Sequence, residues 1–249
     1  MSIVTVDTVS KNFGGHEAVS QVSFSVAEGT IMGLVGSDGA GKTTLLRMVA
    51  AMLKPTAGRI FVKGHDVVSQ KKTVKPLIGY MPQRFGLYQD LTVDENIDFF
   101  MDIFGITGKE RQTRKDFYLG FSNLLPFVHR LARDLSGGMK QKLGLACVLV
   151  HEPAVLILDE PTNGVDPVSR QEFWDILSQM RHDGMTILVS TAYLDEGEKC
   201  DHLMLMHNAH LLAESSPQAL RLNFPDLETA MIHRIQAADK ALADERFNP

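Results

Sequence analysis

The strongest indication of the fold of this chain is the run of residues Gly36-Ser37-Asp38-Gly39-Ala40-Gly41-Lys42-Thr43-Thr44. It fits the pattern G-x-x-x-x-G-K-[ST], a loop whose backbone wraps the phosphates of a nucleotide. Residues 31–35 before it form an apolar run that predicts a buried strand, and residues 45–50 after it predict a helix. This order of strand, loop and helix is the setting that the pattern requires, and it predicts a nucleotide site.

The residue types in this loop suit phosphate binding. Glycines let the backbone bring its N–H groups close to the phosphates, and the N-terminus of the following helix favours an anion. We expect Lys42 to reach the β- and γ-phosphates and the hydroxyl of Thr43 to hold Mg²⁺. An ordinary glycine-rich turn would match the pattern by accident in roughly one chain of this length in a hundred. The flanking strand and helix make such an accident rarer still.

Length and composition narrow the kinds of protein that this chain could be. The chain has 249 residues, of which 44% are hydrophobic, and this suits one large domain or a domain with an inserted subdomain. A formal net charge of −5 argues against nucleic acid as a partner. No run approaches the ~20 apolar residues of a membrane span and no signal pattern opens the chain, so any membrane role is expected through a partner. Cys147 and Cys200 suit a reducing cytosol.

The remaining chain predicts strands and helices around one helical insert. Apolar residues recur at helical spacing from Thr92 onward, and further helices are predicted near 111–121 and 124–133. We therefore expect a nucleotide-binding domain over 1–220 with a helical subdomain at about 84–150. Residues 221–249 are expected to form a helix over Asp226–Ala243 and a polar tail. The expected strands are 3–9, 18–26, 59–63, 78–83, 154–159 and 186–190, with a closing hairpin over 201–206 and 211–214.

A second glycine-containing motif opens a long predicted helix that runs to about Val150. Ser136 is a plausible N-cap, since its hydroxyl oxygen can accept a hydrogen bond from a first-turn amide. Gly137 and Gly138 leave backbone N–H groups open to an anion. An ordinary capped helix explains Ser136 but does not explain both glycines, so this helix start is a second candidate for nucleotide contact.

Two carboxylates, Asp159 and Glu160, end a fully apolar predicted strand. Parallel strands are apolar throughout, and ligands bind beyond their C-terminal ends. Asp159 fits the Mg²⁺ shell, and Glu160 fits a general base that activates water. Acidic residues at strand ends are common in loops of any kind, but the nearby nucleotide loop favours these functional roles.

Together these motifs resemble the ATP-binding cassette (ABC) ATPases. The phosphate loop, Gln83, Leu135–Gln141, Leu158–Pro161 and Asp166 match that family's Walker A, Q-loop, signature, Walker B and D-loop, in that order. The resemblance covers roughly residues 3–220. The signature is highly specific to this family, because nucleotide kinases and GTPases share the phosphate loop but lack the signature.

Two further stretches narrow the resemblance within the family. Residues 79–83 and 190–196 look most like ABC-2-type exporter ATPases. The chain resembles the first half of YbhF-like tandem ATPases, which carry two cassettes in one polypeptide. The resemblance implies an α/β fold, with a P-loop NTPase (RecA-like) core, an antiparallel β subdomain and an inserted helical subdomain.

The resemblance also implies roles for individual residues. Two cassettes would sandwich two ATP molecules, and Phe13 would stack on the adenine. Ser136 and Gly138 would contact the γ-phosphate held by the opposite cassette, with Gly137 and Asp166 in the same nucleotide-binding set. Gln83 would sense Mg²⁺ and the attacking water and would connect the site to a membrane partner. ATP and Mg²⁺ are the implied cofactors.

The chain departs from the family pattern at two positions. Ala192 stands where the family places a switch histidine, and a methyl group cannot hydrogen-bond the γ-phosphate. Removing one such transition-state hydrogen bond typically costs ~10²–10³ in rate. Asp38 replaces the commoner asparagine and adds negative charge near the phosphates. Because Glu160 is retained, we expect a site that binds ATP well and turns it over slowly.

Three functions fit these residues. The first is the ATPase of an ABC-2-type exporter, cytoplasmic and peripheral to the inner face of the plasma membrane, with permease subunits and a second cassette as partners. The second is a regulatory cassette that binds ATP without appreciable hydrolysis, which Ala192 favours and Glu160 opposes. The third is a soluble ABC protein of translation or DNA repair, which the acidic net charge and the length do not favour.

Overall fold

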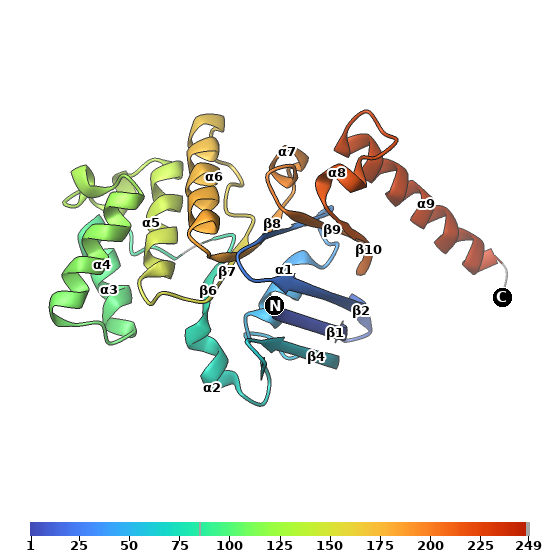
Figure 1. The fold of residues 1–249 in the computed structure, drawn as a ribbon, viewed down its shortest axis with the longest axis horizontal. Helices are drawn as coiled ribbons and strands as arrows, with labels where there is room; N and C mark the ends of the chain where they lie inside the picture. The colour runs from blue at the N-terminus through green and yellow to red at the C-terminus, as the bar shows by residue number, and fades with distance from the viewer. Residues whose placement is uncertain (85, 248–249) are drawn as a thin grey trace.

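The computed structural model describes residues 1–84 and 86–247. Figure 1 shows two sheets at the centre, a group of helices at one end of the molecule and a long C-terminal helix at the other. The smaller sheet has the strand order β2-β1-β4-β5 and is antiparallel. Its strands are β1 (Ser2–Phe13), β2 (His16–Ala27), β4 (Ala57–Val62) and β5 (His65–Asp66).

The larger sheet has the strand order β10-β9-β3-β8-β7-β6. All its neighbouring strands run parallel except β10, which pairs antiparallel with β9. Its strands are β3 (Ile31–Val35), β6 (Ile78–Met81), β7 (Val155–Asp159), β8 (Thr186–Thr191), β9 (His202–His207) and β10 (His210–Ser215). Every residue of β3, β7 and β8 is buried, as expected for parallel strands covered on both faces.

Helices cover both faces of this sheet. Helix α1 (Lys42–Val49) follows β3 and lies between the two sheets, where Leu45, Leu46 and Met48 join a core shared with β1, β2 and β4. A second core on the opposite face joins the sheet to α6 (Pro167–His182) through Phe173 and Trp174. The C-terminal ends of the parallel strands therefore meet at one edge, which places the loop after β3 beside the residues that end β7 and β8.

The helical end of the molecule has its own core. It consists of α3 (Val93–Ile103), α4 (Gly108–Phe121) and α5 (Gly137–Leu149), which pack around Ile97, Met101, Leu119 and Leu143. Thr92 and Glu95 form a reciprocal capping box at the start of α3. The predicted helix over 124–133 is wrong. That segment holds two separate 3₁₀ turns, η2 (Leu125–Phe127) and η3 (Ala132–Asp134), and Pro126 in the first cannot donate a backbone hydrogen bond.

The C-terminal part adds the last strands to one edge of the larger sheet and continues as two helices. The predicted hairpin is present as β9 and β10, and α8 (Pro217–Leu220) and α9 (Leu227–Phe247) follow it. Helix α9 continues past Ala243, so the expected polar tail from 244 is wrong as far as Phe247, and residues 248–249 lie outside the described part. Short elements complete the chain: α2 (Lys71–Val74), η1 (Lys75–Leu77) and α7 (Leu194–Gly197). No helix of the described residues is both long and apolar enough to cross a membrane.

Candidate nucleotide-binding site

The loop between β3 and α1 needs glycine at two positions for reasons internal to the fold. Gly36 has a φ of 154°, and a Cβ on it would lie 2.2 Å from the carbonyl oxygen of Met206. Gly41 has a φ of 104°, and a Cβ there would lie 2.2 Å from the carbonyl oxygen of Ala18. Gly39 also has a positive φ, 78°, but open space surrounds it. The loop is therefore wrapped tightly at both ends and open in its middle, toward the cavity.

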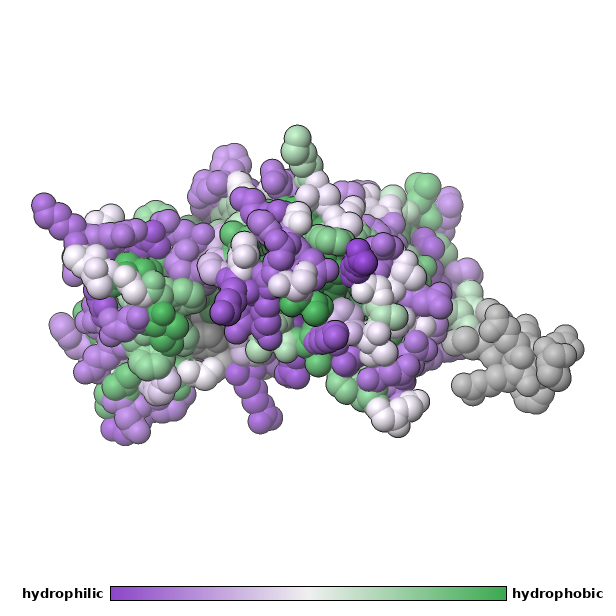
Figure 2. Space-filling model, turned by 90° about the horizontal axis from the view of Figure 1, so that it is seen from below, coloured by the Kyte–Doolittle hydropathy of each residue, from purple (hydrophilic) through white to green (hydrophobic). Residues whose placement is uncertain are grey.

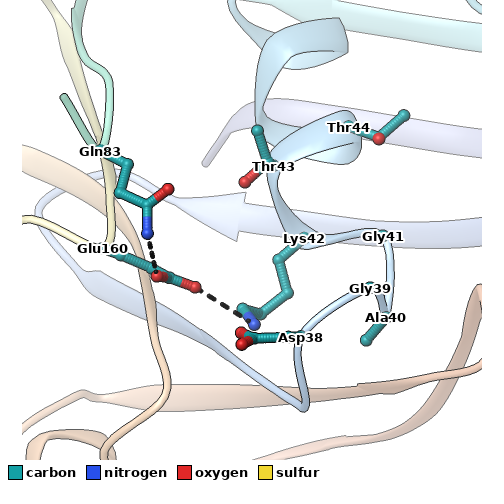
Figure 3. A pocket seen from close by; sticks show the side chains of 9 residues that line it. All are labelled: Asp38, Gly39, Ala40, Gly41, Lys42, Thr43, Thr44, Gln83 and Glu160. Carbon is teal, nitrogen blue, oxygen red and sulfur yellow. Dashed lines mark hydrogen bonds and ion pairs between the residues drawn. The ribbon is translucent and has the colours of Figure 1, made fainter. Parts of the chain in front are cut away.

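The loop forms one wall of a cavity of about 320 Å³. Figure 3 shows the opposite wall, where Gln83 and Glu160 point toward the loop from separate segments of the chain. The structure thus brings together nine sequence-predicted residues around one space. The lining residues are Asp38, Gly39, Ala40, Gly41, Lys42, Thr43, Thr44, Gln83 and Glu160. Gly36 and Ser37 lie at the base of the loop, where their carbonyl oxygens accept hydrogen bonds from Lys42.

Lys42 is almost fully buried at the first position of α1. Its ammonium Nζ donates hydrogen bonds to the carbonyl oxygens of Gly36 at 2.7 Å and Ser37 at 3.1 Å. It also lies 3.4 Å from Oε1 of Glu160. A buried ammonium needs such partners because desolvation of an unpaired charge is costly. The contacts fix the charge at the cavity, in front of the helix N-terminus, where an anion is favoured.

Asp159 is a buried carboxylate that accepts hydrogen bonds from three hydroxyl groups. Its Oδ1 accepts from Oγ1 of Thr43 and from Oγ of Ser190, both at 2.9 Å, and its Oδ2 accepts from the hydroxyl of Tyr80 at 3.3 Å. Within residues 1–84 and 86–247, no lysine or arginine forms an ion pair with Asp159. A buried negative charge with oxygen ligands beside it, and without a cationic side chain, fits a hard divalent cation such as Mg²⁺. Thr43 and Asp159 would hold it.

Glu160 follows directly and turns its carboxylate into the cavity. Its φ of 49° lies in the left-handed region, which is uncommon for a residue with a side chain. Ser190 stabilises this turn, since its Oγ accepts a hydrogen bond from the Glu160 N–H at 3.0 Å. Gln83 donates from Nε2 to Glu160 Oε2 at 2.9 Å, and Asn163 donates from Nδ2 to the same oxygen at 3.3 Å. The carboxylate is thus oriented from two sides.

Tyr80 and Ser190 are functional candidates that the sequence patterns did not single out. Burial raises the pKa of Tyr80, partly opposed by a hydrogen bond with Arg47, so its hydroxyl is a neutral donor to Asp159 near pH 7. Both residues are polar groups on the strands that flank β7, one on β6 and one on β8. Polar residues near the C-terminal ends of strands adjacent to an Asp-Glu pair were the available signal.

Phe13 does not line the loop cavity. It lines a neighbouring hollow of about 590 Å³, and Thr44 borders both spaces. The ring is half exposed, and Nζ of Lys11 lies 4.9 Å from its centroid over one face. The position beside the loop and the exposed aromatic surface are compatible with stacking on a base.

Ser136, Gly137 and Asp166 also lie away from the loop cavity. Ser136 is the N-cap of α5, and its Oγ accepts a hydrogen bond from the N–H of Met139 at 3.3 Å. Asp166 is the N-cap of α6, and the backbone N–H of Ser169 donates to its carboxylate at 2.9 Å. That hydrogen bond holds the pKa of Asp166 below its ordinary value. Both residues have a structural role at a helix start, and both are exposed.

The segment that carries Ala192 is held by a buried glutamate. Glu196 is fully buried, and its carboxylate accepts hydrogen bonds from Thr162 at 2.7 Å and Thr191 at 2.5 Å. Arg170 lies 3.8 Å from the same carboxylate. Ala192 itself is exposed, next to the anchored Thr191. The backbone of this segment is therefore fixed, while the side chain at 192 is only a methyl group.

Comparison with known proteins shows to which family this chain belongs. The sequence model of the ABC transporter family matches residues 19–163, which is more than half of the chain. This chain belongs to the ABC transporter family. It is an ATP-binding cassette, and this confirms the resemblance and the fold class expected from the motifs.

Two relatives of the cassette carry names that refer to drug transport or drug resistance. It is 48% identical over 221 residues to the probable multidrug ABC transporter ATP-binding protein YbhF of Escherichia coli (strain K12), an alignment covering 88% of this chain and 38% of YbhF. It is 36% identical over 219 residues to the daunorubicin resistance ATP-binding protein DrrA3 of Streptomyces coeruleorubidus, covering 88% of this chain and 69% of DrrA3.

A solved structure supports the same assignment. The ATP-binding subunit of an ABC transporter superposes with a TM-score of 0.83 at 26% identity, over 94% of this chain and 99% of that one.

Proposed function

We propose that this cassette binds ATP with Mg²⁺, hydrolyses it slowly and powers an ABC-2-type membrane exporter. The observation that carries the proposal is the convergence of Lys42, Gln83 and Glu160 on one cavity beside the Thr43–Asp159 pair. Phosphate-binding, metal-binding and water-activating groups are the parts that phosphoryl transfer to water requires. The exporter assignment is supported by the names of two relatives, which refer to a multidrug ABC transporter and to daunorubicin resistance.

Each side chain has a role that follows from its position. Lys42 and the N-terminus of α1 would bind the β- and γ-phosphates. Thr43 and Asp159 would hold Mg²⁺, and Gln83, which lines the same cavity, would contact the ion as well. The ion would neutralise charge on the phosphate oxygens. Glu160 would accept a proton from the attacking water, and Gln83 and Asn163 keep its carboxylate aimed at the cavity. Phe13 would stack on the adenine.

The slow turnover rests on Ala192. Thr191 beside it is tied to Glu196, so the segment presents its backbone and a methyl group where a histidine would offer a hydrogen bond. A missing transition-state hydrogen bond of this kind lowers the rate by ~10²–10³. A regulatory cassette that clamps ATP without appreciable turnover is the second candidate, and it differs from the first only in whether Glu160 still acts.

A second cassette is part of the proposal. The chain spans 38% of the length of YbhF. Ser136 and Gly137 are exposed at the N-terminus of α5 and do not line this chain's own cavity, which leaves them available to a nucleotide held by another cassette. Gly138 and Asp166 would join them in that contact. A competent cassette opposite this one would supply the faster of the two sites.

Membrane permease subunits are the other proposed partners, with the cassette at the inner face of the plasma membrane. The helical end of the molecule exposes large apolar side chains, among them Ile103, Phe104, Phe117 and Leu125. Figure 2 shows hydrophobic surface at the end of the molecule that holds α3 and α4. Exposed apolar surface of this kind is typical of interaction sites.

The test measures ATP binding and phosphate release together in three proteins: wild type, Lys42→Ala and Glu160→Gln. Lys42→Ala should weaken ATP binding about ten- to a hundredfold, because a charge-assisted contact to phosphate is lost. Glu160→Gln should keep binding and reduce phosphate release to the Lys42→Ala level. Lys109→Ala, on the exposed surface of α4, is the matched control and should change neither quantity.

The outcomes separate the candidates. Wild-type protein that binds ATP but releases no more phosphate than Lys42→Ala supports the regulatory cassette. Phosphate release that survives in Glu160→Gln contradicts the role given to Glu160. Unchanged ATP binding in Lys42→Ala contradicts the assignment of the site itself.

A further inference from the structure

We propose that Tyr80 is a positioning residue for Asp159: its hydroxyl orients the carboxylate and so sets how tightly the site holds Mg²⁺. The inference rests on the proposed function, because it assigns a role toward the metal that ATP binding would bring. The juxtaposition that carries it is the hydrogen bond from the Tyr80 hydroxyl to Oδ2 of Asp159 at 3.3 Å.

The sheet register explains why these two side chains meet. Tyr80 on β6 pairs with Ile157 on β7, and Asp159 lies two residues further along β7. Alternation along a strand puts Ile157 and Asp159 on the same face of the sheet. Ile157 and Tyr80 both pack in the core that contains α1, so the phenol extends along this face toward the strand end where Asp159 lies. The tyrosine ring is long enough to reach the carboxylate that a shorter side chain would miss.

The two carboxylate oxygens of Asp159 accept hydrogen bonds from different donors. Thr43 and Ser190 both donate to Oδ1, whereas Tyr80 is the donor to Oδ2 within residues 1–84 and 86–247. Rotation about the Asp χ2 bond is soft, since this torsion has no sharp staggered wells. Contacts at one oxygen alone leave that rotation free, and a contact at the second oxygen fixes the carboxylate plane. Loss of the Tyr80 hydroxyl would therefore loosen a metal ligand without removing it.

Outer-shell groups of this kind tune metal affinity. Partners that hydrogen-bond a ligating carboxylate typically change metal affinity or activity by roughly 10–100-fold when removed. The 3.3 Å distance is long for an O–H donor, so we expect an effect at or below the lower end of that range. Tyr80 also lines the hollow of about 590 Å³ beside Phe13, Arg47 and Pro82. The residue thus connects that hollow to the carboxylate of the metal site.

The test titrates Mg²⁺ against binding of the fluorescent analogue trinitrophenyl-ATP, with a series in EDTA. For Tyr80→Phe we expect unchanged affinity in EDTA and a Mg²⁺ midpoint raised by roughly three- to tenfold. Tyr118→Phe removes a hydroxyl from a similarly half-buried tyrosine on α4 and should behave as wild type. In an Asp159→Asn background, Tyr80→Phe should cause no further loss of the Mg²⁺ enhancement, because residues that act through one another are non-additive.

The outcomes distinguish this inference from the function beneath it. Mg²⁺ that strengthens binding equally in wild type and Tyr80→Phe overturns the role of Tyr80 and leaves the nucleotide site intact. Mg²⁺ that has no effect on wild-type binding overturns the metal assignment of Thr43 and Asp159, and the inference with it. A Tyr80→Phe loss that is already present in EDTA, or persists fully in Asp159→Asn, shows a packing defect and contradicts the inference.

Discussion

Gly138 lies directly against Ser169: a Cβ placed on the glycine would be 2.4 Å from the Cβ and 2.5 Å from the Oγ of that serine. Helix α5 therefore needs a glycine here to pack against the first turn of α6. This requirement is independent of any nucleotide. The second glycine of the signature is fixed by helix packing in this chain, whereas Gly137 has open space around it.

Gly138→Ala should lower the free energy of unfolding by about 1–3 kcal/mol, because overpacking forces the two helices apart. Ser169→Gly removes both clashing atoms and should by itself cost only about 0.5–1 kcal/mol. Urea unfolding of the single and double variants measures the coupling. The double variant should be more stable than the sum of the single changes predicts. Strict additivity would show that the contact does not determine the cost.

Glu196 ties three segments together, and its removal should be costly. Glu196→Ala leaves the hydroxyls of Thr162 and Thr191 without their acceptor and leaves Arg170 without one of its carboxylates. We expect a loss of about 3–5 kcal/mol in the free energy of unfolding, as when one partner of a buried pair is removed. Thermal unfolding measures this. Replacement of the exposed Glu198 by alanine is the matched control, and equal losses in both variants would contradict the account.

His151 makes the helical end of the molecule sensitive to mild acid. Its ring stacks on Phe104 with centroids 3.9 Å apart, and its Nε2–H donates to the carbonyl oxygen of Ile78 at 3.2 Å. The other nitrogen, Nδ1, is buried and has no hydrogen-bond partner among the described residues. Protonation would add a buried N–H without an acceptor. Burial accordingly lowers the pKa of His151 below its ordinary value of 6.5.

The sign of the pH effect follows from that shift. Above pH 6.5 the imidazole is neutral in both states and its contribution to stability is complete. As the pH falls below 6.5 toward the lowered value, the unfolded chain takes up the proton first, and the free energy of unfolding decreases. His151→Gln should flatten this slope between pH 6.5 and 5 in urea titrations, whereas His129→Gln, at an exposed position, should keep it. Identical slopes in all three proteins would refute the assignment.

Local motifs made the loop and its chemistry predictable from the sequence. The loop Gly36–Thr44 can be recognised from its own pattern and from the strand and helix predicted on either side of it. Asp159 and Glu160 can be recognised because they directly follow an apolar run. Contacts between separate elements were not predictable in this way. Tyr80 meets Asp159 through the register of β6 on β7, and Gly138 meets Ser169 through the packing of α5 on α6. Neither register nor helix packing leaves a pattern in the local sequence.

Two sequence predictions fail, each for its own reason. Apolar residues at 124–133 suggested a helix, but tertiary contacts with the helical core leave two 3₁₀ turns there. The polar residues after Ala243 predict that the helix ends there, whereas α9 runs to Phe247. Composition predicts exposure better than it predicts where a helix ends.

Steady-state phosphate release shows whether the alanine at position 192 limits turnover, with Lys42→Ala as the blank and Ala192→His beside the wild type. Wild-type phosphate release should lie slightly above the blank. Ala192→His should rise well above it, by up to ~10²–10³, because the missing hydrogen bond is restored. Wild-type turnover at an ordinary enzyme rate of about 10 s⁻¹, unchanged in Ala192→His, would show that the site is fully competent without the histidine and would contradict the account.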